Sequence, residues 1–550
     1  MATVNFNKKQ FEKEIGKLDD KMQEKIALFG TPVEKISSDE LVLEVFPNRP
    51  DVLSYHGFKR SFLAFLGKKP GLKQYKLHKP EKNYKVIIDS SVKDIRPYTT
   101  CAIVKGIKFN DEKIKEIIEI QEKLHITVGR KRKKLAIGIY PLEKIKLPIT
   151  YKALEPDKIK FTPLESSREM SGLEILQRHP TGKDYAHLLA GKEKFPIFID
   201  ANKEILSLPP IINSQLTGKV DEKTRDIFIE FSGSEFDILK KGLNIIITSL
   251  ADMGGEVYQM ELKGGKEKIS PNLSTEKMKI SLENTNKLLG LNITEKQLGN
   301  LIRKMGYEYS QGKVEIPSWR TDILHEVDLI EDVAIAYGYE NIIPEIPKIS
   351  TIGQENKEET IKRKISEILS GLGMVEVSNY HLTNKEFQFR KMGIQKKQDS
   401  GFVELEESKT ENNILRKDLT HFLLKNFAEN IDAEYPQKIF EIGKIFKINE
   451  KTNELKEEEK LAIGITPGNF TEIKQVLEFI SKMIDIDLKL EIEEEPLNHF
   501  IEGRVGKIIL DKKQIGSMGE IHPKILSNWK IKMPIALLEI NLKEIFEKLA

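Results

Sequence analysis

The spacing of hydrophobic residues near the amino terminus predicts a helix, a strand and a second helix. Residues 8–29 have a helical pattern and residues 40–45 have that of a strand. A turn follows at 46–51, and a second helix then runs to Gly67. The apolar stripe of this second helix consists of Leu53, Phe58, Phe62, Phe65 and Leu66.

Residues 84–265 mix strand-like and helix-like patterns, which predicts an α+β domain. A helix is expected over 111–124. The strand-like segments are 86–88, 99–104, 135–140, 195–199, 226–231 and 243–249.

Glycine and proline residues mark two further boundaries. Gly264, Gly265 and Pro271 precede a compact helical unit, in which Thr294 is expected to cap a helix that Gly306 ends. Residues 352–550 form a further α/β unit, with an acidic insert at 449–459 expected to be a hairpin or loop. A chain of 550 residues is too long for one core. The predicted domains are 1–80, 84–265, 270–345 and 352–550.

The segment 319–339 predicts a helix with carboxylates on one side. Val327, Ile330, Val333, Ala334 and Tyr337 follow helical spacing and define an apolar face. Thr321 or Asp322 is expected to cap the helix start.

Asp328, Glu331 and Asp332 fall within an arc of about 100° opposite that apolar face. Three carboxylates this close repel one another, and a hard divalent cation such as Mg²⁺ would relieve the repulsion, with Asp322 as a fourth ligand. The alternative is a solvated polar face paired with Arg303 or Arg320.

Composition narrows the function classes. The formal charge is +3, with 88 Lys and Arg against 85 Asp and Glu, so any nucleic-acid site must be a local patch. The single cysteine, Cys101, excludes a disulfide framework and a multi-cysteine zinc site, and we interpret it as a small buried residue. Neither a signal peptide nor a membrane span is evident, so a cytoplasmic protein without membrane contact is expected.

Several segments together carry a family resemblance. Residues 317–323 (PSWRTDI), with Asp328, 331–334 and 337–339, closely resemble the acidic-helix domain of phenylalanyl-tRNA synthetase beta subunits. The other matching segments, some typical of the archaeal/eukaryotic type, are 46–51, 127–138, 196–200, 209–214 and 519–523. Their shared order along nearly the whole chain makes the resemblance specific.

The resemblance implies a class II aminoacyl-tRNA synthetase subunit, a multidomain α+β protein. Its parts would be an N-terminal α/β domain, an α+β editing domain, a small helical metal-binding domain and a C-terminal synthetase-like antiparallel sheet domain. The implied partners are an alpha subunit, in an assembly of two alpha and two beta chains, and tRNA(Phe). ATP is the implied substrate of the whole enzyme, and Asp322, Asp328, Glu331 and Asp332 are the implied Mg²⁺ ligands.

In this family the middle domain hydrolyses mischarged tyrosyl-tRNA. An apolar pocket rejects an added hydroxyl only about 100-fold, so a second site must recognise it with a polar group. The polar candidates here are Asn213, Thr217, Arg225 and Asp226, with an Arg–Asp pair on an edge strand as the alternative. No nucleophile is evident, so an oriented water and the ribose hydroxyls of the tRNA are expected to act.

A basic run precedes the strand at 135–140. Arg130, Lys131, Arg132 and Lys133 could contact tRNA phosphates, in which case binding should weaken with salt. The alternative is a solvated charge run.

Residues 352–550 resemble a class II synthetase catalytic fold without its active site. Arg416 stands where an ATP-binding arginine would be, but the expected G-x-G-x-G-x-x-R signature is absent, and 502–506 is a poor match to it. The aminoacylation site is therefore expected on the alpha subunit, and His522 is interpreted as a structural residue.

Two rival functions remain open: a free-standing hydrolase of mischarged tRNA, and a non-enzymatic RNA-binding scaffold. Co-expression with an alpha subunit separates them from the synthetase hypothesis, because only a synthetase subunit would restore charging.

Overall fold

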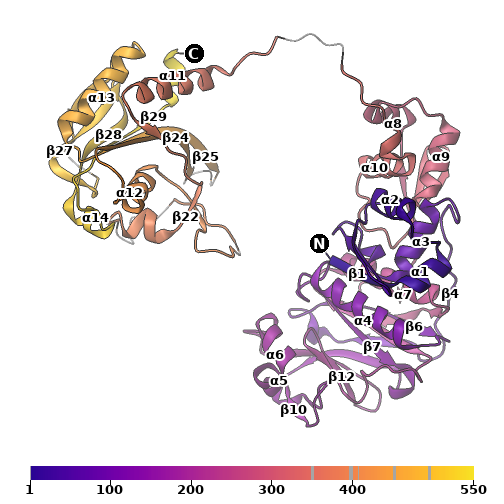
Figure 1. The fold of residues 1–550 in the computed structure, drawn as a ribbon. Coiled ribbons are helices and arrows are strands. Elements are labelled where there is room, and N and C mark those ends of the chain that lie inside the picture. Colours follow the sequence, from indigo (N-terminus) through magenta and orange to yellow (C-terminus); the bar gives the residue numbers. More distant parts are fainter. Residues whose placement is uncertain are drawn as a thin grey trace. The chain divides into compact units, whose positions relative to one another are not determined.

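The computed structural model describes residues 2–347, 352–394, 401–406, 408–449, 452, 454–493 and 497–549. The chain forms two units, Met1–Ile346 and Pro347–Ala550, which Figure 1 shows with their elements labelled. None of the described helices is both long enough and apolar enough to cross a membrane.

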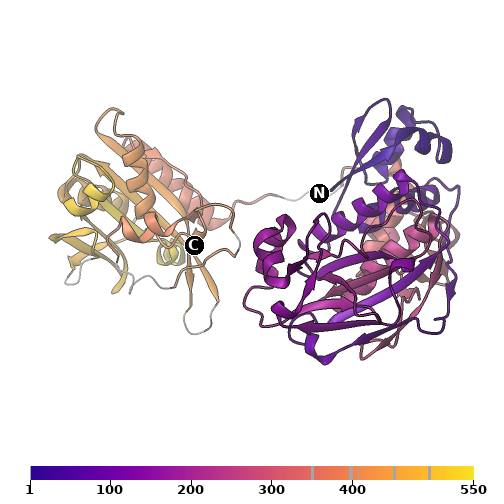
Figure 2. The ribbon, with the colours of Figure 1, turned by 90° about the horizontal axis from the view of Figure 1, so that it is seen from below.

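Unit 1 begins with a three-stranded antiparallel sheet in the order β1-β3-β2, packed against three helices. Its strands are β1 (Ala2–Asn7), β2 (Val33–Ile36) and β3 (Glu40–Val45). The helices are α1 (Lys8–Glu14), α2 (Asp20–Leu28) and α3 (Tyr55–Phe65). In Figure 2 the indigo strands of this segment stand apart from the purple strands of two larger sheets.

The predicted single helix over 8–29 is therefore wrong. The chain leaves α1 at Ile15, passes Gly16 at a φ of 150°, and begins α2 with Asp19 as its cap. Glycine tolerates that backbone angle at no steric cost, and the Asp19 side chain accepts the N–H of Met22.

The middle of unit 1 holds two large sheets packed face to face. One is the sheet β13-β12-β11-β8-β5-β16-β17 and the other is β4-β15-β6-β14-β7. The first has strands β5 (Lys85–Ile88), β8 (Ile149–Leu154), β11 (Phe195–Ile199), β12 (Ile205–Leu208), β13 (Ile212–Asn213), β16 (Met260–Lys263) and β17 (Ile269–Ser270). The second has β4 (Leu77–His78), β6 (Tyr98–Lys105), β7 (Leu135–Pro141), β14 (Ile227–Gly233) and β15 (Glu256–Tyr258).

Side chains from the facing strands form the core between these sheets. Cys101 on β6, Tyr140 on β7, Phe228 on β14 and Tyr151 on β8 all belong to it. Cys101 is fully buried, and burial raises the pKa of its thiol, which agrees with its interpretation as a small core residue.

Two helices cover the other face of the second sheet: α4 (Asp111–Ile126) and α7 (Phe236–Asp252). The prediction of a strand at 243–249 is wrong, because this segment lies in the middle of α7. Every residue from Gly242 to Leu250 is buried, so the helix has no polar face there. A short apolar run without periodicity does not distinguish a buried strand from a buried helix.

The segment 270–345 combines helices with a small sheet, so it is not purely helical as expected. The helices are α8 (Leu282–Leu289), α9 (Glu295–Lys304) and α10 (Glu326–Tyr337). The sheet is ordered β18-β20-β19 and consists of β18 (Glu276–Lys279), β19 (Glu308–Ser310) and β20 (Lys313–Ile316). Thr294 caps α9 as predicted, in a reciprocal capping box with Gln297.

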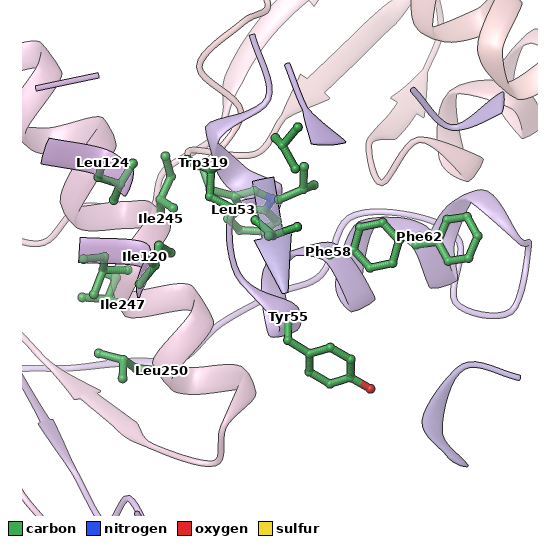
Figure 3. Packing of buried hydrophobic residues seen from close by; sticks show 14 of the residues in the cluster. Leu53, Tyr55, Phe58, Phe62, Ile120, Leu124, Ile245, Ile247, Leu250 and Trp319 are labelled. Carbon is green, nitrogen blue, oxygen red and sulfur yellow. The ribbon is translucent and has the colours of Figure 1, made fainter. Parts of the chain in front are cut away.

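One continuous core joins these parts of unit 1. Figure 3 shows Phe58 and Phe62 of α3, Ile120 and Leu124 of α4, Ile245 of α7, and Trp319 within it. The phenyl rings of Phe58 and Phe62 stack with their centroids 5.0 Å apart. The domain boundaries predicted near 80 and 265 stay predictions, since no break in the core marks them.

Unit 2 is built on a seven-stranded sheet in the order β21-β24-β25-β29-β28-β27-β26, antiparallel except for β21 and β24. Its strands are β21 (Val375–Glu376), β24 (Gln437–Ile448), β25 (Leu455–Thr466), β26 (Lys489–Ile492), β27 (Phe500–Leu510), β28 (Lys513–Ile521) and β29 (Ala536–Asn541). The short strands β22 (Leu382–Thr383) and β23 (Ile414–Leu415) pair separately.

Helices cover both faces of this sheet. One face packs against α11 (Lys357–Gly371), α13 (Phe470–Met483) and α15 (Lys543–Leu549). The other packs against α12 (Thr420–Glu429) and α14 (Pro523–Asn528). The sheet is antiparallel apart from its β21–β24 pair and carries helices on both faces, like the sheet expected for residues 352–550. Within the acidic insert, residues 455–459 belong to β25, which pairs antiparallel with β24, whereas residues 450, 451 and 453 lie outside the described residues.

Candidate functional site

A cavity of about 170 Å³ opens at the end of the middle sheets, beside α4. Its walls come from α4, from the loop before β7, from β12 and β13, and from β14. The lining residues used below are Glu122, His125, Arg132, Ser207, Asn213 and Glu230. Residues distant in the chain meet here because β7 and β14 pair along their length and the two sheets pack together.

Glu230 is the chemically unusual residue of this cavity. It is the one charged residue in the fully buried strand β14, and its side chain shares a face with Cys101 and Gly138, its partners in register. A Cβ on Gly138 would lie 2.5 Å from Glu230 Oε1 and 2.2 Å from the Tyr140 hydroxyl. Glycine at this position therefore leaves the space in which the carboxyl and the phenol meet.

Burial raises the pKa of Glu230 to about 8, so at neutral pH its carboxyl holds a proton. The Tyr140 hydroxyl lies 3.2 Å from Glu230 Oε1 and 3.4 Å from Asn213 Oδ1. One hydroxyl proton cannot serve both oxygens at once. The arrangement is consistent if protonated Glu230 donates to Tyr140 and Tyr140 donates to Asn213.

Three polar atoms of the residues that line the cavity lack a well-formed hydrogen bond to any residue that the structure describes. They are Glu230 Oε2, Ser207 Oγ and Arg132 Nε, and all three are buried. A buried polar atom without a partner costs about 1–3 kcal/mol unless water or a ligand satisfies it. The wall therefore offers one carboxyl oxygen and one hydroxyl to a polar group on a bound molecule.

The opposite wall is a set of paired groups around His125. Its Nε2 accepts the Ile137 N–H at 2.9 Å, and its Nδ1 faces Glu122 Oε1 at 3.2 Å. Burial lowers the pKa of His125, so the ring is neutral and carries its proton on Nδ1. A ring nitrogen already accepting a main-chain N–H is not free to act as a general base.

The titration of Glu230 gives a testable pH dependence of stability. Between its ordinary pKa of 4.5 and about 8, the folded state keeps a proton that the unfolded state releases. The stability that this group contributes is fully present below about pH 4.5 and is lost as the pH rises through about 8. Over this range the free energy of unfolding falls by up to about 1.4 kcal/mol per pH unit. Urea unfolding at about pH 5 and about pH 8.5 should show this slope for the wild type and a smaller one for Glu230→Gln. Equal slopes would contradict the protonated state.

Of the four residues predicted for recognition, Asn213 lines the cavity and the other three do not. Thr217 is buried, with its hydroxyl near the Leu206 carbonyl. Arg225 donates to the carbonyls of Glu222 and Thr224, and Asp226 accepts the Gly106 N–H. The alternative, an Arg225–Asp226 pair, does not occur among the ion pairs of the described residues either.

Sequence reasoning did not single out Glu230, although a signal was present. Residues 227–233 read IFIEFSG, with one carboxylate inside an apolar strand. A charged residue is almost never fully buried without a partner or a function.

The basic run at 130–133 forms a loop between α4 and β7. Its side chains differ in their exposure to solvent. Arg130, Lys131 and Lys133 are exposed. Arg132 instead lines the cavity, donating to the Ile211 carbonyl and to Glu122, and its guanidinium lies 4.4 Å from the Tyr185 ring centre. The structure thus leaves three of the four predicted cations open to solvent.

This loop has an unusual backbone that a buried arginine holds in place. Arg130, Lys131 and Arg132 have φ angles of 46°, 52° and 65°, which non-glycine residues rarely adopt. The guanidinium of Arg96 donates to the carbonyls of Arg132, Lys133 and Ser232. Burial lowers the pKa of Arg96 to about 10, so it remains charged at neutral pH.

The acidic helix begins later than predicted. Its first residue is Glu326, with His325 as the cap, so Asp322 lies in the loop before the helix and neither Thr321 nor Asp322 caps it. Val327 is 45% exposed, whereas Leu329 and Asp332 are buried. The helix is therefore rotated relative to the predicted apolar face, because Leu329 packs into the core.

Three of the four predicted metal ligands already accept hydrogen bonds from the protein, and two of them share one arginine. Arg320 donates to both oxygens of Asp322, at 2.8 and 2.7 Å, and to Asp332 at 2.8 Å. Asp332 also accepts the Tyr307 hydroxyl. Asp328 Oδ2 accepts the N–H groups of Leu324 and His325. Glu331 is exposed.

This donor set does not fit a Mg²⁺ ion as it stands. The part of the chain that the structure describes contains no group of three or more His, Cys, Asp or Glu side chains placed to hold a metal. A guanidinium already neutralises Asp322 and Asp332, so a cation there would have to displace Arg320. The assignment of Mg²⁺ to Asp322, Asp328, Glu331 and Asp332 stays a prediction.

In unit 2, Arg416 is buried and paired with Glu441. It is 1% exposed, and it donates to Glu441 Oε1 at 2.6 Å and to the Lys444 carbonyl at 2.7 Å. A buried, paired guanidinium is not available to a nucleotide phosphate. His522 caps α14 and accepts the Lys524 N–H, which agrees with its interpretation as structural.

Comparison with known proteins identifies the family. Residues 342–542 match the family described as "Phenylalanyl tRNA synthetase beta chain CLM domain", and residues 278–339 match the "tRNA synthetase B5 domain". The curated "Phenylalanine--tRNA ligase beta subunit" of Archaeoglobus fulgidus is 37% identical over 555 residues, covering 100% of this chain and 99% of the relative. That of Thermococcus sibiricus is 38% identical over 509 residues, covering 91% and 90%.

A solved structure agrees with these relatives. The N-terminal fragment of the Pyrococcus horikoshii phenylalanyl-tRNA synthetase beta subunit is 34% identical, with a TM-score of 0.59. The match covers 61% of this chain and 99% of the fragment. The chain therefore belongs to the phenylalanyl-tRNA synthetase beta-subunit family, whose members are parts of an aminoacyl-tRNA synthetase.

Proposed function

We propose that unit 1 hydrolyses tyrosyl-tRNA formed in error by a phenylalanine–tRNA ligase, and that the cavity at Glu230 recognises the tyrosine hydroxyl. The observation that carries the proposal is a protonatable, fully buried carboxyl with one unpartnered oxygen, set in the wall of a small cavity. A cavity of about 150 Å³ accepts a benzene-sized ligand, so about 170 Å³ is sufficient for a phenol ring.

The chemistry of the wall suits this discrimination. Phenylalanine and tyrosine differ by one hydroxyl, which an apolar pocket rejects only weakly. A site built to hydrogen-bond that hydroxyl rejects the analogue lacking it by about 10⁴–10⁵-fold, because its polar groups are then left unpaired. Glu230 Oε2 and Ser207 Oγ are groups that tyrosine would satisfy and phenylalanine would not.

Hydrolysis itself is assigned to a bound water and the ribose hydroxyls of the tRNA. Among the described residues that line the cavity, the one histidine, His125, already accepts a main-chain N–H. No side chain there combines a nucleophile with a free base. The protein's part is then to hold the ester and exclude phenylalanine.

The test is deacylation of tyrosyl-tRNA by the complex of alpha and beta subunits. Asn213→Ala removes the acceptor that orients Tyr140 and should slow hydrolysis about tenfold, the effect of losing one buried hydrogen bond. Asp226→Ala is the matched control, since Asp226 is not among the residues lining the cavity. An undiminished rate for Asn213→Ala, or equal losses for both variants, would refute the assignment.

The exposed cations of the loop before β7 are proposed to contact tRNA phosphates near the cavity. Replacing Arg130, Lys131 and Lys133 by alanine should weaken tRNA binding and reduce the slope of log affinity against log salt by about 0.7–0.9 for each phosphate that is no longer neutralised. Binding measured at several salt concentrations checks this. Lys152→Ala, Lys158→Ala and Lys194→Ala together give a control of equal charge change elsewhere in the middle domain. An unchanged slope in the loop variant would show that these cations are only solvated.

The remaining functional expectations follow from the family. We infer an alpha subunit as partner, an assembly of two alpha and two beta chains, and tRNA(Phe) as substrate. ATP and Mg²⁺ serve the whole enzyme, and the aminoacylation site belongs to the alpha subunit. The ion pair between Arg416 and Glu441 supports the inference that unit 2 does not bind ATP.

A further inference from the structure

A second cavity of about 410 Å³ lies in unit 1, away from the one at Glu230. Its walls come from α3, from the loop 69–73, from the end of α7 and from the segment 317–320 before the acidic helix. We call it the basic cavity, and its polar and aromatic lining residues used here are Lys59, Arg60, Lys69, Lys73, Asp252, Trp319 and Arg320. Small-molecule sites usually measure about 300–1,000 Å³, so its volume is in that range. It shares no lining residue with the cavity at Glu230.

The lining carries a strong excess of positive charge. Five of its residues are lysine or arginine, and Asp252 is its one acidic residue. Asp252 is shared, since Arg60 Nη1 donates to its Oδ2 at 2.8 Å and Lys73 Nζ lies 2.5 Å from its Oδ1. One carboxylate is thus shared by two of the cations. Lys59 pairs with Glu14, and Arg320 pairs with Asp322 and Asp332, whose side chains do not line the cavity. Lys69 is the lining cation that has no ion pair among the described residues.

Two of these cations are buried and incompletely satisfied. The side chain of Arg60 is 7% exposed and that of Arg320 is 3% exposed. Arg60 Nε and Nη2, and Arg320 Nη1, find no hydrogen-bond partner among the residues that the structure describes. Each of these guanidinium groups has charged N–H donors without an acceptor. Burying an unpaired charged donor costs more free energy than burying an unpaired neutral one. A shift of these two side chains toward the cavity would let a bound anion supply the acceptors.

A buried indole ring in the wall of the cavity holds one of these guanidinium groups. The guanidinium carbon of Arg60 lies 4.5 Å from the centre of the Trp319 ring, and Tyr75 meets the same ring edge-on at 5.3 Å. Stacking holds the Arg60 guanidinium in a fixed plane, so its unpartnered N–H groups keep a fixed direction. Fixed guanidinium forks are the groups that bind phosphate bidentately.

We propose that the basic cavity binds a small ligand that carries a phosphate or diphosphate group, such as a nucleotide. Arg60 and Arg320 bind the phosphate oxygens, and Lys69 closes the site from its exposed rim. The site acts independently of the hydrolysis proposed at Glu230, because the two cavities have separate walls.

Trp319 makes the site directly observable. The chain contains two tryptophans, and Trp529 lies in unit 2. In the full-length Trp529→Phe protein, we expect pyrophosphate and AMP to produce a saturable change in Trp319 fluorescence. Adding Lys69→Glu should raise the Kd about tenfold, the effect of reversing one charge beside a bound anion. Lys69 is exposed, so its replacement leaves the fold intact.

Lys76→Glu is the matched control: it makes the same charge change on an exposed residue nearby that does not line the cavity. Absence of a saturable response to pyrophosphate and AMP, or equal Kd values for Lys69→Glu and Lys76→Glu, would overturn the proposal. A response to tRNA alone would assign the phosphate to the RNA backbone and would also overturn the small-ligand assignment.

Discussion

Replacing Glu230 by alanine is expected to lower kcat/KM for hydrolysis of tyrosyl-tRNA by about 100-fold, which corresponds to about 2.7 kcal/mol. The substitution removes the carboxyl that we assign to the tyrosine hydroxyl and leaves the Tyr140 hydroxyl without that partner. The measurement is single-turnover deacylation by the alpha–beta complex. Charging with phenylalanine should continue at the wild-type rate, because the aminoacylation site is assigned to the other subunit.

Glu230→Gln separates recognition from packing. Glutamine has nearly the same volume and resembles the protonated carboxyl, which is the form expected at neutral pH. We expect it to keep most of the hydrolysis near pH 7 and to lose the pH dependence of binding above about pH 8. If Glu230→Ala hydrolyses tyrosyl-tRNA as fast as the wild type, the cavity at Glu230 is not the editing site.

Replacing Arg320 by methionine is expected to destabilise unit 1 by about 3–5 kcal/mol. The substitution leaves the carboxylates of Asp322 and Asp332 buried or half-buried without their cation. It also removes the guanidinium that lies 5.1 Å from the Tyr307 ring centre. The free energy of unfolding from urea titration measures the loss.

A double variant and a metal titration give the controls for Arg320. Arg320→Met with Asp332→Leu should recover part of the stability, since it removes a buried charge together with its partner. A loss below about 1 kcal/mol in the single variant would show that the ion pairs contribute little. Added Mg²⁺ should stabilise Arg320→Met more than the wild type if the freed carboxylates form a cation site.

The relation between sequence and structure differs between segments. Periodicity correctly predicted α3, α4 and α9, because each has an apolar stripe at helical spacing and a clear cap or end. It failed at 243–249, where burial on all sides removes the helical period. Periodicity also predicted one helix in place of α1 and α2, because the break at Gly16 does not change the spacing of the apolar residues around it.

In the candidate site, too, the sequence predicted some residues correctly and others not. Asn213 was found from its type and position, and it lines the cavity. Arg225 and Asp226, adjacent in the chain, lie outside it because their side chains bond to the main chain next to β14. The four carboxylates predicted to bind a cation include three with helical spacing. The main-chain N–H groups of Leu324 and His325 engage Asp328, and the guanidinium of Arg320 engages Asp322 and Asp332.

By itself the sequence determined the family, the α+β class, the order of most elements and the absence of an ATP-binding signature in residues 352–550, because these depend on local patterns and short motifs. Only the tertiary structure decided which polar groups share a cavity. Glu230, Gly138 and Ser207 are far apart in the chain. Glu230 meets Gly138 because β14 pairs with β7, and it shares the cavity with Ser207 because the two sheets pack face to face. Burial then raises the pKa of Glu230, an effect that depends on every neighbour and on no single segment of sequence.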